Sequence, residues 1–551
     1  MSETLARTSA DGSQGGAQAP QQGRRPAWLT PVNLTIIIIT LIGLILRVYY
    51  QYTRPGFLLG VTEYDDGPYF GSAVRLVHGS MPYKDFVLVQ PPGIALLMSP
   101  VGLLTYWTGT AWGLAIGRIL TLLAASAGIV LAGLLVRHRG LLAVLLTCGI
   151  VAVYSDGVAA AHTVLVEPWL VLFCLAGAVA VFDGDRITAS TKRLVWGGVL
   201  FGFAGAVEAW AIVPVLVLAL LCLPQIKRAA IFVGGVAAGF VIPVLPFAIA
   251  GPTQLYRSLI TAQVGYRAHA VRVGVLLRLR NMIGIPYALG WSKTLLLLAV
   301  LALVIFVVVT QAAAILVTQQ PPPTLDWFAG VTTVLIIAMF LWPPQFHYHF
   351  TEFLAPFMAL TLALPVSRLL GGARPDGSLA VTWPPTGSAK TARQVGTAIV
   401  GVSALALAVV AAFQFRFESG APRVIGPIPA AIDQMIPPGA CVLTDQASVT
   451  LAANRFVSTD PNCPKLIDSL GTTLALSNGL KPQTGAANVA AVNTAWNQAF
   501  SRAQYVLLTA SNPRRIAWSP QLEAYFASHF SQVYQSPRKL TLYVRNGLHA
   551  G

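Results

Sequence analysis

Long apolar runs separated by short polar segments dominate the chain. A helix needs about 20 apolar residues to cross a bilayer, with a lower limit of about 17, so we expect most of these runs to be transmembrane helices. Two runs, 194–207 and 210–223, are short and predict a tight hairpin with Glu208 at its tip. In all, the pattern predicts eleven crossings, at residues 32–50, 112–135, 140–156, 165–182, 194–207, 210–223, 229–250, 292–317, 327–343, 350–367 and 395–414.

The positions of the basic residues set the orientation of these helices, because Arg and Lys concentrate in cytoplasmic loops. Placing the basic clusters inside predicts a cytoplasmic amino terminus and an exterior carboxyl terminus. Residues 92–108 are also apolar, but a crossing there would put Arg137-His138-Arg139 outside, so we expect a juxtamembrane helix on the outer face. The clusters are Arg24-Arg25, Arg137-His138-Arg139, Arg186 with Lys192-Arg193, Lys227-Arg228, and Arg368, Arg374, Lys390 and Arg393.

The two ends of the chain differ from its apolar middle. Residues 1–31 are rich in Gly, Gln, Ser and Pro and predict a disordered cytoplasmic tail. Residues 32–414 form the predicted transmembrane domain, and the polar residues 415–551 predict a small exterior α/β domain. Strand patterns occur at Cys441–Thr444, Tyr505–Leu508 and Leu540–Val544, with helical character at Pro520–Phe530.

The cysteines divide between these regions. Cys148, Cys174 and Cys222 lie within apolar runs, where a thiol behaves as a small hydrophobic group. Cys441 and Cys463 lie in the polar carboxyl-terminal region. If that region faces an oxidising exterior, the pair is expected to form a disulfide.

Composition supports a membrane protein and excludes an ordinary soluble enzyme. The 551 residues are 55% hydrophobic and only 10% charged, with a mean hydropathy of +0.67. The formal net charge is +16, but the basic residues are scattered between apolar runs. We therefore expect membrane lipids and phosphates as partners, not nucleic acid, and a multi-pass protein of the plasma (inner) membrane. The abundance of Ala, Val and Gly is typical of a high-GC bacterium such as an actinobacterium.

The first exterior loop carries the most unusual polar residues. It opens with Glu63-Tyr64-Asp65-Asp66, three carboxylates within four residues beside a bilayer. Acids at such a position are costly and indicate a functional site; the alternative is that they only keep the loop hydrated. The same loop closes on Tyr83-Lys84-Asp85-Phe86 and Gln90-Pro91-Pro92-Gly93. In the predicted topology His162, Glu167, Glu208, His347 and His349 also lie at the exterior end.

A basic loop follows at residues 251–291. It contains five arginines and no acid, although the topology places it outside. An anionic phosphate would compensate these charges, because the planar fork of Arg binds phosphate oxygens in pairs. We expect Arg267 and Arg272 to be the phosphate ligands. The alternative is an amphipathic helix resting on lipid head groups.

Two histidines precede the tenth predicted crossing. His347 and His349 are alternate residues, so in an extended turn they face the same side. Hydrogen bonding is favoured over metal binding, because no zinc-type spacing accompanies them. We assign no metal ligands, although a divalent cation held by Asp66 and Glu167 remains an alternative.

The order of these motifs over residues 33–370 resembles the GT-C superfamily of polyprenyl-phosphate-dependent glycosyltransferases. That superfamily includes protein O-mannosyltransferases, aminoarabinose transferases and actinobacterial envelope mannosyl- and arabinosyltransferases. Asp65-Asp66 resembles its acidic pair, and the Tyr83–Gly93 segment its juxtamembrane motif. Val166-Glu167-Pro168-Trp169 resembles its acid-Pro pair, and His347-Tyr348-His349, leading to Leu354-Ala355-Pro356, its exterior turn. Two departures are Gln90, where aminoarabinose transferases have an acid, and Glu208, where related actinobacterial sequences often have Lys.

The resemblance implies a GT-C-like catalytic domain at residues 32–414. It would move a sugar from a polyprenyl-phosphate donor to an envelope glycan, glycolipid or protein acceptor on the exterior face, with inversion. Asp65 would be the base, with Asp66 and Glu167 orienting the acceptor or holding a cation. Substrate contacts would come from Tyr64, Lys84, Asp85, Gln90, His162, Arg267, Arg272, His347 and His349.

Other functions remain open from the sequence. A lipid or glycan transporter or flippase would place polar sites near the bilayer midplane and often shows internal repeats, and a catalytically silent scaffold is a third possibility. The predicted exterior domain 415–551 either binds acceptor or carbohydrate, or packs as a cap over the transmembrane site.

Overall fold

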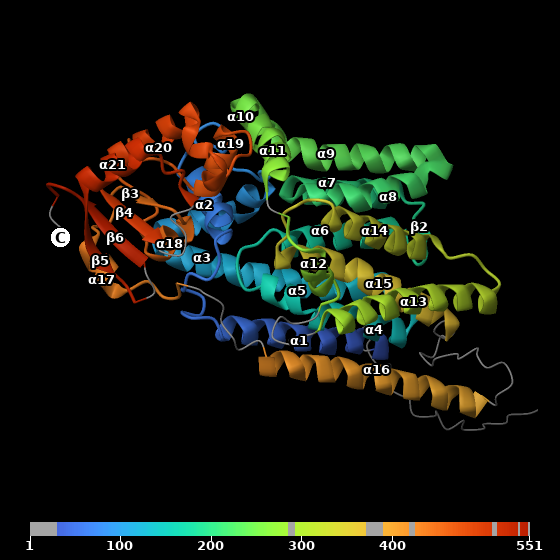
Figure 1. Cartoon of the computed structure of the whole chain (residues 1–551). Helices are drawn as coiled ribbons and strands as arrows, with labels where there is room; N and C mark the ends of the chain where they lie inside the picture. Colours follow the sequence, from blue (N-terminus) through green and yellow to red (C-terminus); the bar gives the residue numbers. More distant parts are fainter. Residues whose placement is uncertain are drawn as a thin grey trace, which may run out of the picture.

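The structure is a computed structural model that describes residues 30–270, 272–284, 292–370, 389–417, 425–509, 515–537 and 540–548. Residues 1–29 of the expected tail lie outside the described part. Figure 1 shows a bundle of roughly aligned helices with a smaller α/β unit at one end. Below, the end that carries Asp65 and the α/β unit is called the acidic-loop end, and the other is called the opposite end.

Each range predicted to cross the membrane overlaps a helix of the bundle. The helices are α1 (Pro31–Tyr52), α3 (Gly93–Val136), α4 (Leu141–Val153), α6 (Glu167–Val181), α7 (Thr191–Val207), α8 (Ile212–Cys222), α9 (Ile226–Ala250), α13 (Lys293–Thr318), α14 (Thr324–Leu341), α15 (Thr351–Leu369) and α16 (Ala389–Phe417). Among the described residues, six helical stretches are long and apolar enough to cross a membrane: Pro31–Tyr52, Gly93–Arg139, Ala209–Ala250, Lys293–Thr318, Thr324–Leu341 and Tyr348–Leu369.

Helix starts follow local capping chemistry. Thr30 precedes α1 and accepts a hydrogen bond from the Asn33 backbone N–H at 3.2 Å. Ser292 caps α13 in the same way through Leu295 N at 3.2 Å. Such side chains satisfy backbone donors that the first turn of a helix leaves unpaired.

The stretch Gly93–Val136 is two helices, not one. Gly109 has φ 78° and ψ 166°, which breaks the helix. A Cβ placed on Gly113 would lie 2.4 Å from Thr105 Cγ2, and one on Gly117 would lie 3.7 Å from Met98 Sδ. Residues 93–108 therefore fold back beside residues 110–136, as a helix separate from the following one. The expected place of residues 92–108 on the outer membrane face stays a prediction.

Close backbone packing joins α7 to α9. A Cβ on Gly202 would lie 2.1 Å from Val236 O, and one on Gly239 would lie 2.1 Å from Val199 O. Small residues at such contacts let apolar helices approach where lipid offers no hydrophobic driving force. Glu208 is the non-helical residue between α7 and η2 (Ala209–Ala211), which leads into α8, as the predicted hairpin tip requires.

Shorter elements connect the bundle helices. They are α2 (Asp66–Val77), η1 (Arg137–Arg139), α5 (Ser155–Ala160), β1 (Phe182–Asp183), β2 (Arg186–Ile187), η3 (Leu223–Gln225), α10 (Pro252–Tyr256), η4 (Arg257–Thr261), α11 (Ala262–His269), α12 (Val275–Met282) and η5 (Tyr348–Phe350).

The carboxyl-terminal segment contains a four-stranded sheet in the order β3-β4-β6-β5. β3 and β4 are parallel, and β6 pairs antiparallel with both β4 and β5. The three predicted strands are confirmed as β3 (Val442–Thr444), β4 (Tyr505–Thr509) and β6 (Leu540–Arg545). The remaining elements are β5 (Phe530–Gln535), α17 (Ala430–Met435), α18 (Ala447–Ala452), α19 (Ser469–Leu476), η6 (Pro482–Thr484), η7 (Ala486–Asn488), α20 (Ala490–Arg502) and α21 (Pro520–His529).

A disulfide links Cys441 to Cys463, with their Cα atoms 5.4 Å apart, which confirms the predicted pairing. The segment is also joined to the bundle. Asn454 accepts a hydrogen bond from Ala111 N at 2.9 Å and so caps the helix that starts after the Gly109 break. Thr110 donates to Leu451 O at 2.7 Å. The α/β unit therefore stabilises the point where the chain reverses.

Candidate active site

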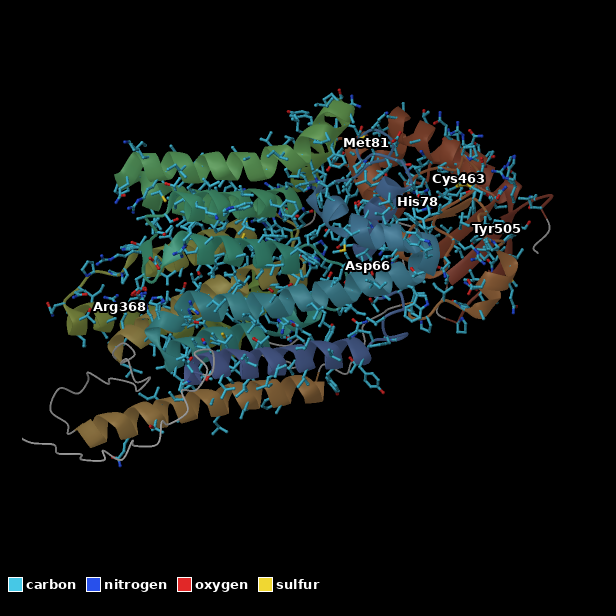
Figure 2. The ribbon with its side chains drawn as sticks, turned by 180° about the vertical axis from the view of Figure 1, so that it is seen from behind. Asp66, His78, Met81, Arg368, Cys463 and Tyr505 are labelled. Atoms are coloured by element: carbon cyan, nitrogen blue, oxygen red, sulfur yellow. A yellow bond between two sulfur atoms is a disulfide. The ribbon has the colours of Figure 1, made fainter. Side chains whose placement is uncertain are left out.

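The loop that carries Glu63-Tyr64-Asp65-Asp66, called the acidic loop below, lies where the α/β unit meets the bundle. Figure 2 shows Asp66 toward the end that holds Cys463 and Tyr505, far from Arg368. Val61 pairs with Gly426 through two backbone hydrogen bonds, of 2.8 and 3.0 Å. Asp65 occupies the N-cap position of α2 and accepts a backbone hydrogen bond from Tyr69 N at 3.1 Å. The backbone at Gly426 thus holds the start of the loop, and the first turn of α2 holds its end.

Asp65 faces a buried pair formed by His349 and Glu167, and these three residues are called the Asp65 group below. His349 Nδ1 lies 2.8 Å from Glu167 Oε1, and His349 Nε2 lies 3.7 Å from Asp65 Oδ2. A ring N–H donated to Glu167 leaves the other ring nitrogen directed at Asp65. The 3.7 Å separation is too long for a hydrogen bond, so that contact is electrostatic. Glu167 and His349 are 1% and 4% exposed in their side chains, whereas Asp65 is 28% exposed and so the accessible member of the three.

The pKa of Asp65 is raised to about 7, chiefly by burial. His349 lowers the pKa, and the neighbouring carboxylates Glu63, Asp468 and Glu167 raise it. Although 28% of the side chain is exposed, the rest lies among protein atoms. A carboxylate with a pKa near neutrality suits general-base work, because it is ionised in part and still basic at physiological pH.

Asp66 faces away from this group. Its Oδ2 forms an ion pair with Arg118 Nη2 at 2.7 Å, and both side chains are fully buried. Thr163 donates to the same carboxylate oxygen at 2.7 Å. Arg118 also donates to the carbonyl oxygens of Leu58 and Gly60. Asp66 therefore ties the loop to the bundle.

The carboxyl-terminal segment also binds the acidic loop directly. Tyr64 donates its hydroxyl to Asp468 Oδ1 at 2.7 Å and accepts from Leu470 N at 3.1 Å. Glu63 O accepts from Gln446 Nε2 at 2.8 Å and from Ser448 Oγ at 3.0 Å. The loop conformation therefore depends on residues some 400 positions further along the chain.

Arg515 lies over the ring of Tyr64 and extends this contact. Its Cζ is 4.1 Å from the ring centroid, a cation–π distance. Arg515 Nη1 donates to Gln446 Oε1 at 2.7 Å and lies 3.9 Å from Asp445 Oδ2.

The other two histidines predicted for the site, His347 and His162, have lowered pKa values. His347 stacks on His349, with ring centroids 5.5 Å apart, and burial lowers its pKa to about 4. His162 Nδ1 contacts Ala159 O, and burial lowers its pKa to about 3. His347 thus belongs to the Asp65 group through His349, whereas His162 packs against Tyr50 at 5.7 Å.

Comparison with known proteins is informative for structure. No protein-family model and no curated protein sequence matches the chain. ArnT from Cupriavidus metallidurans bound to undecaprenyl phosphate matches with a TM-score of 0.58 and 13% identity, over 94% of this chain and 99% of that one. Its apo state gives 0.55 and 14%, over 93% and 98%. The apo oligosaccharyltransferase of Archaeoglobus fulgidus gives 0.50 and 13%, over 95% and 75%.

The chain has the fold of the GT-C glycosyltransferase superfamily. The fold class expected from the sequence, a polytopic helical membrane protein with GT-C architecture and a carboxyl-terminal α/β unit, is confirmed. At these identities the likeness concerns the fold, so the chemistry must be argued from the side chains.

Several residues expected in the GT-C site are not in contact with Asp65 among the described residues. Asp85 Oδ2 accepts from Met81 N at 2.7 Å within its own turn, and Lys84 is exposed. Gln90 O accepts from the hydroxyl of Tyr83, while its side-chain oxygen is buried without a hydrogen-bond partner in the described chain. These residues shape the closing turns of the loop.

The arginines of the basic loop differ in burial. Arg278 is fully buried and donates to the carbonyls of Val273, Phe340 and Pro344, so it holds the loop to α14. Arg272 is exposed and donates to Trp342 O at 3.0 Å. Arg267 is exposed near the end of α11. Neither Arg267 nor Arg272 contacts the Asp65 group in the described residues.

Asp66 Oδ1 and Glu167 Oε2 are among the buried carboxylate oxygens that lack hydrogen bonds in the described chain. They belong to the residues expected to hold a cation if one binds. Within the described ranges, however, no group of three or more His, Cys, Asp or Glu side chains is arranged to hold a metal ion.

Sequence reasoning missed four contributors. Glu63 was seen as part of the acidic cluster but given no role; its Oε2 accepts from the Tyr348 hydroxyl at 3.3 Å, and burial above all raises its pKa. The sequence predicts Glu208 at a hairpin tip on the exterior side and assigns it no role in the site; burial, with a contribution from Glu167, raises its pKa to about 8. Asp468 and Arg515 lie in the α/β unit, where no local motif marks them.

Proposed function

We propose that this protein is an integral membrane glycosyltransferase that moves a sugar from a polyprenyl-phosphate donor to a hydroxyl acceptor, with Asp65 as the general base. The observation that carries the proposal is the Asp65–His349–Glu167 group within a GT-C fold. It combines an accessible carboxylate of raised pKa with a buried imidazole and a second carboxylate that fix its surroundings.

The transfer follows from these positions. Asp65 takes the proton of the acceptor hydroxyl as the acceptor oxygen bonds to the anomeric carbon. The bond from that carbon to the phosphate oxygen breaks, and polyprenyl phosphate leaves with the electron pair. A single base that works on the face opposite the leaving group gives inversion. His349, held by Glu167, balances the negative charge near Asp65 before the proton arrives.

Arg267 and Arg272 remain our candidates for the donor phosphate. Both are exposed, whereas Arg118 and Arg278 have their donors engaged inside the protein. An exposed guanidinium can form paired hydrogen bonds with phosphate oxygens and stabilise the charge that develops there. The solved ArnT structure is bound to undecaprenyl phosphate, and a donor of that class fits this proposal.

For the carboxyl-terminal segment, the contacts favour a positioning role over acceptor capture. Asp468, Gln446 and Ser448 all bind the acidic loop. Gly67 supports the same role, because a Cβ there would lie 2.5 Å from Ser448 N, so the two backbones are in close contact. The segment would therefore keep Asp65 in a working position during turnover.

The proposed membrane placement is the one given by charge: amino terminus cytoplasmic, residues 32–414 in and at the membrane, and 415–551 exterior. Reporter fusions test it. A fusion after Ser378 should report the cytoplasm, and one at Gly551 the exterior. The same side for both would mean that α16 does not cross the membrane, and a cytoplasmic Gly551 would place the α/β unit and Asp65 on the wrong face for an exterior transferase.

The rival function, a transporter or flippase, calls for polar sites near the middle of the bilayer. Asp66, the chain neighbour of Asp65, instead lies toward the end that holds the α/β unit (Figure 2), and Tyr64 and Glu63 are hydrogen-bonded to that unit. The deciding experiment incubates purified protein and the Asp65→Asn variant with radiolabelled polyprenyl-phosphate sugars and native membranes. Label should enter a membrane glycan, glycolipid or protein with wild type only. Equal label transfer by the variant would reject Asp65 as base, and donor movement without transfer would favour the transporter.

A further inference from the structure

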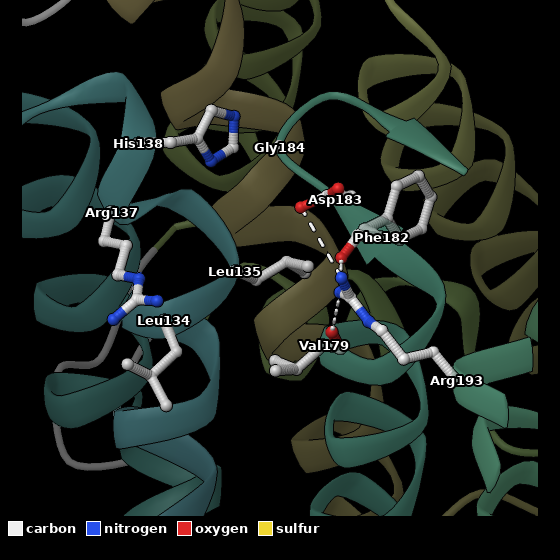
Figure 3. Close-up of a pocket in the computed structure, with 9 residues that line it drawn as sticks. All are labelled: Leu134, Leu135, Arg137, His138, Val179, Phe182, Asp183, Gly184 and Arg193. Atoms are coloured by element: carbon white, nitrogen blue, oxygen red, sulfur yellow. Dashed lines mark hydrogen bonds and ion pairs between the residues drawn. The ribbon is translucent and has the colours of Figure 1, made fainter. Parts of the chain in front are cut away.

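A cavity of about 470 Å³ lies at the opposite end of the bundle. It is formed by the ends of α3 and α6, the β1–β2 turn and the start of α7. Figure 3 shows its lining: Leu134, Leu135, Arg137, His138, Val179, Phe182, Asp183, Gly184 and Arg193. None of the residues proposed for sugar transfer lines it. A cavity of this size lies in the range that holds small ligands, so its chemistry is considered separately.

One wall of the cavity is committed to structure. Arg193 donates to the carbonyl oxygens of Val179, Ala180 and Phe182, which covers the carbonyl end of α6. Arg193 Nη1 also lies 3.5 Å from Asp183 Oδ1, and the Asp183 side chain is 74% exposed. Arg193 thus neutralises the negative end of α6 and the carboxylate of Asp183. An unpaired positive charge in the cavity must therefore come from another residue.

That free charge is Arg137. It is exposed, and no hydrogen bond or ion pair engages its guanidinium among the described residues. Its two neighbours are both engaged: His138 Nε2 lies 2.8 Å from Asp185 Oδ1, and Arg139 bonds both Asp185 and Asp326. In Figure 3 Arg137 lies across the cavity from Arg193, with Leu135 and Val179 between them.

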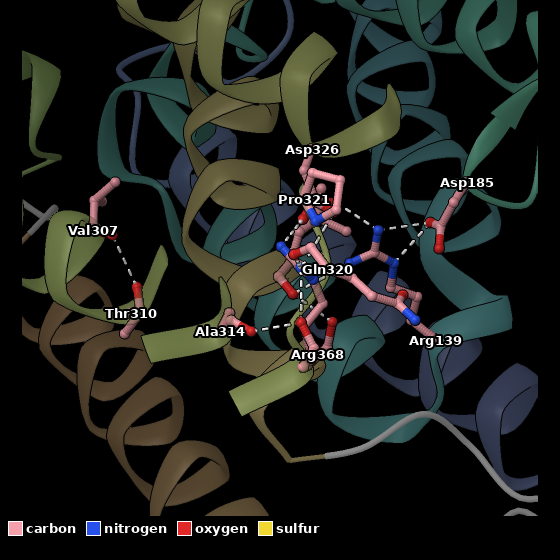
Figure 4. Close-up of polar contacts among 12 residues, drawn as sticks. Arg139, Asp185, Val307, Thr310, Ala314, Gln320, Pro321, Asp326 and Arg368 are labelled. Atoms are coloured by element: carbon pink, nitrogen blue, oxygen red, sulfur yellow. Dashed lines mark hydrogen bonds and ion pairs between the residues drawn. The ribbon is translucent and has the colours of Figure 1, made fainter. Parts of the chain in front are cut away.

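A largely buried ion network anchors the turn that carries Arg137. Figure 4 shows Arg139 bonded to Asp185, with Asp326 and Arg368 beside it. Arg368 Nη1 lies 3.6 Å from Asp326 Oδ2. The network links η1, the β1–β2 turn, α14 and α15, so Arg137 is presented on a fixed backbone. A preorganised cation loses less entropy on binding than one on a mobile loop.

We propose that this cavity binds the phosphate head group of an anionic phospholipid, with Arg137 as its ligand. The apolar wall of Leu134, Leu135, Val179 and Phe182 fits an amphiphile and not a free ion. The cavity also lies where an apolar stretch, Gly93–Arg139, ends, the depth at which lipid head groups meet a transmembrane helix. Arg fits phosphate through paired hydrogen bonds.

Spin-labelled lipids test this on the full-length protein. Wild type and variants are reconstituted in phosphatidylcholine vesicles with spin-labelled phosphatidylglycerol or phosphatidylcholine, and the motionally restricted fraction of each label gives the anionic preference. Arg137→Ala should reduce the preference about tenfold, as expected for the loss of hydrogen bonds to a charged group. Arg137→Lys should keep part of it, because Lys supplies charge without the fork.

Arg186→Ala is the matched control, since Arg186 is exposed on β2 beside the cavity and does not line it. It should change the preference by less than about twofold. Equal losses for Arg137→Ala and Arg186→Ala would mean diffuse surface attraction, worth about fivefold for each charge, and would overturn the proposal. So would a wild type without any anionic preference. Displacement of phosphatidylglycerol by excess inorganic phosphate would assign the cavity to free phosphate and overturn the lipid source.

Discussion

Asp66 and Arg118 form an ion pair at 2.7 Å in which neither side chain is exposed. This separates the two neighbouring acids of the loop: Asp66 holds the structure, and Asp65 faces the His349–Glu167 pair. Asp66→Asn should leave Arg118 buried without a counter-charge and lower the free energy of unfolding by about 3–5 kcal/mol. Thermal unfolding in detergent measures it.

Asp65→Asn is the matched control for that experiment, because among the described residues the ion pair of its side chain is the 3.7 Å contact with His349, 1 Å longer than that of Asp66. We expect near wild-type stability with no transfer activity. A stable and active Asp66→Asn protein would show that the ion pair does not hold the loop.

The rate of transfer should depend on pH through Asp65. Its pKa is raised to about 7, so below that pH the carboxylate is protonated and cannot accept the acceptor proton. The rate should therefore rise with pH through about 7 and level off above it. Asp468 raises the pKa of Asp65 by charge repulsion, so Asp468→Asn should move the midpoint to lower pH. Asn still accepts the Gly471 N–H that Asp468 accepts at 2.7 Å.

Asp433→Asn provides the control, since Asp433 is an exposed acid on α17 of the same α/β unit. Its pH–rate midpoint should match that of wild type. A midpoint that Asp468→Asn leaves unchanged would rule out charge coupling between the α/β unit and Asp65. A midpoint that rises would contradict the sign of the coupling.

Glu167 should act through His349. In wild type, His349 Nδ1 lies 2.8 Å from a carboxylate oxygen of Glu167. Glu167→Gln keeps an oxygen acceptor for this nitrogen but removes the negative charge. We expect kcat to fall, by as much as about a hundredfold if the imidazole is displaced by 1 Å. KM should change little. Steady-state kinetics with a polyprenyl-phosphate sugar measures both. A rise in KM alone would instead make Glu167 a substrate-binding residue.

The disulfide should stabilise the α/β unit. Cys441 and Cys463 are 22 residues apart, and closing a loop of that length is worth about 3 kcal/mol by chain-entropy estimates. The Cys441→Ser/Cys463→Ser protein should therefore unfold at lower temperature, and non-reducing mass spectrometry should find the pair oxidised in wild type. Cys148→Ser, at a buried thiol outside the unit, reports the effect of losing a cysteine elsewhere.

Local patterns accounted for much of this fold. Apolar runs located the bundle helices, and alternation located β3, β4 and β6, because both signals arise within a few residues. These local patterns do not show which distant residues lie close together in space. Asp468 binds Tyr64 across 404 positions, and nothing near Asp468 marks it as part of a site. Likewise, whether Asp65 or Asp66 faces His349 depends on Arg118 and Thr163, which belong to other elements.

The chain reversal at Gly109 gives the last prediction. Its φ of 78° and ψ of 166° lie in a region that is essentially restricted to glycine, and a Cβ there would lie 2.6 Å from Asn454 Oδ1. Gly109→Ala should therefore cost about 1–3 kcal/mol in backbone strain, and further stability where Asn454 is pushed from its hydrogen bond to Ala111 N. Asn454→Ala alone should cost about 1 kcal/mol, the typical value of a lost N-cap.

The double variant Gly109→Ala/Asn454→Ala separates the two causes. It removes the clash but keeps the strained backbone, so its loss of stability should be smaller than the sum of the single losses. Gly234→Ala is the control, because Gly234 lies in α9 with nothing within 4 Å of an added Cβ, and alanine there should be neutral or stabilising. Chemical unfolding of the four proteins measures the set. If Gly109→Ala is as harmless as Gly234→Ala, the reversal at Gly109 does not require glycine, and the packing of residues 93–108 against 110–136 must be held by the α/β unit alone.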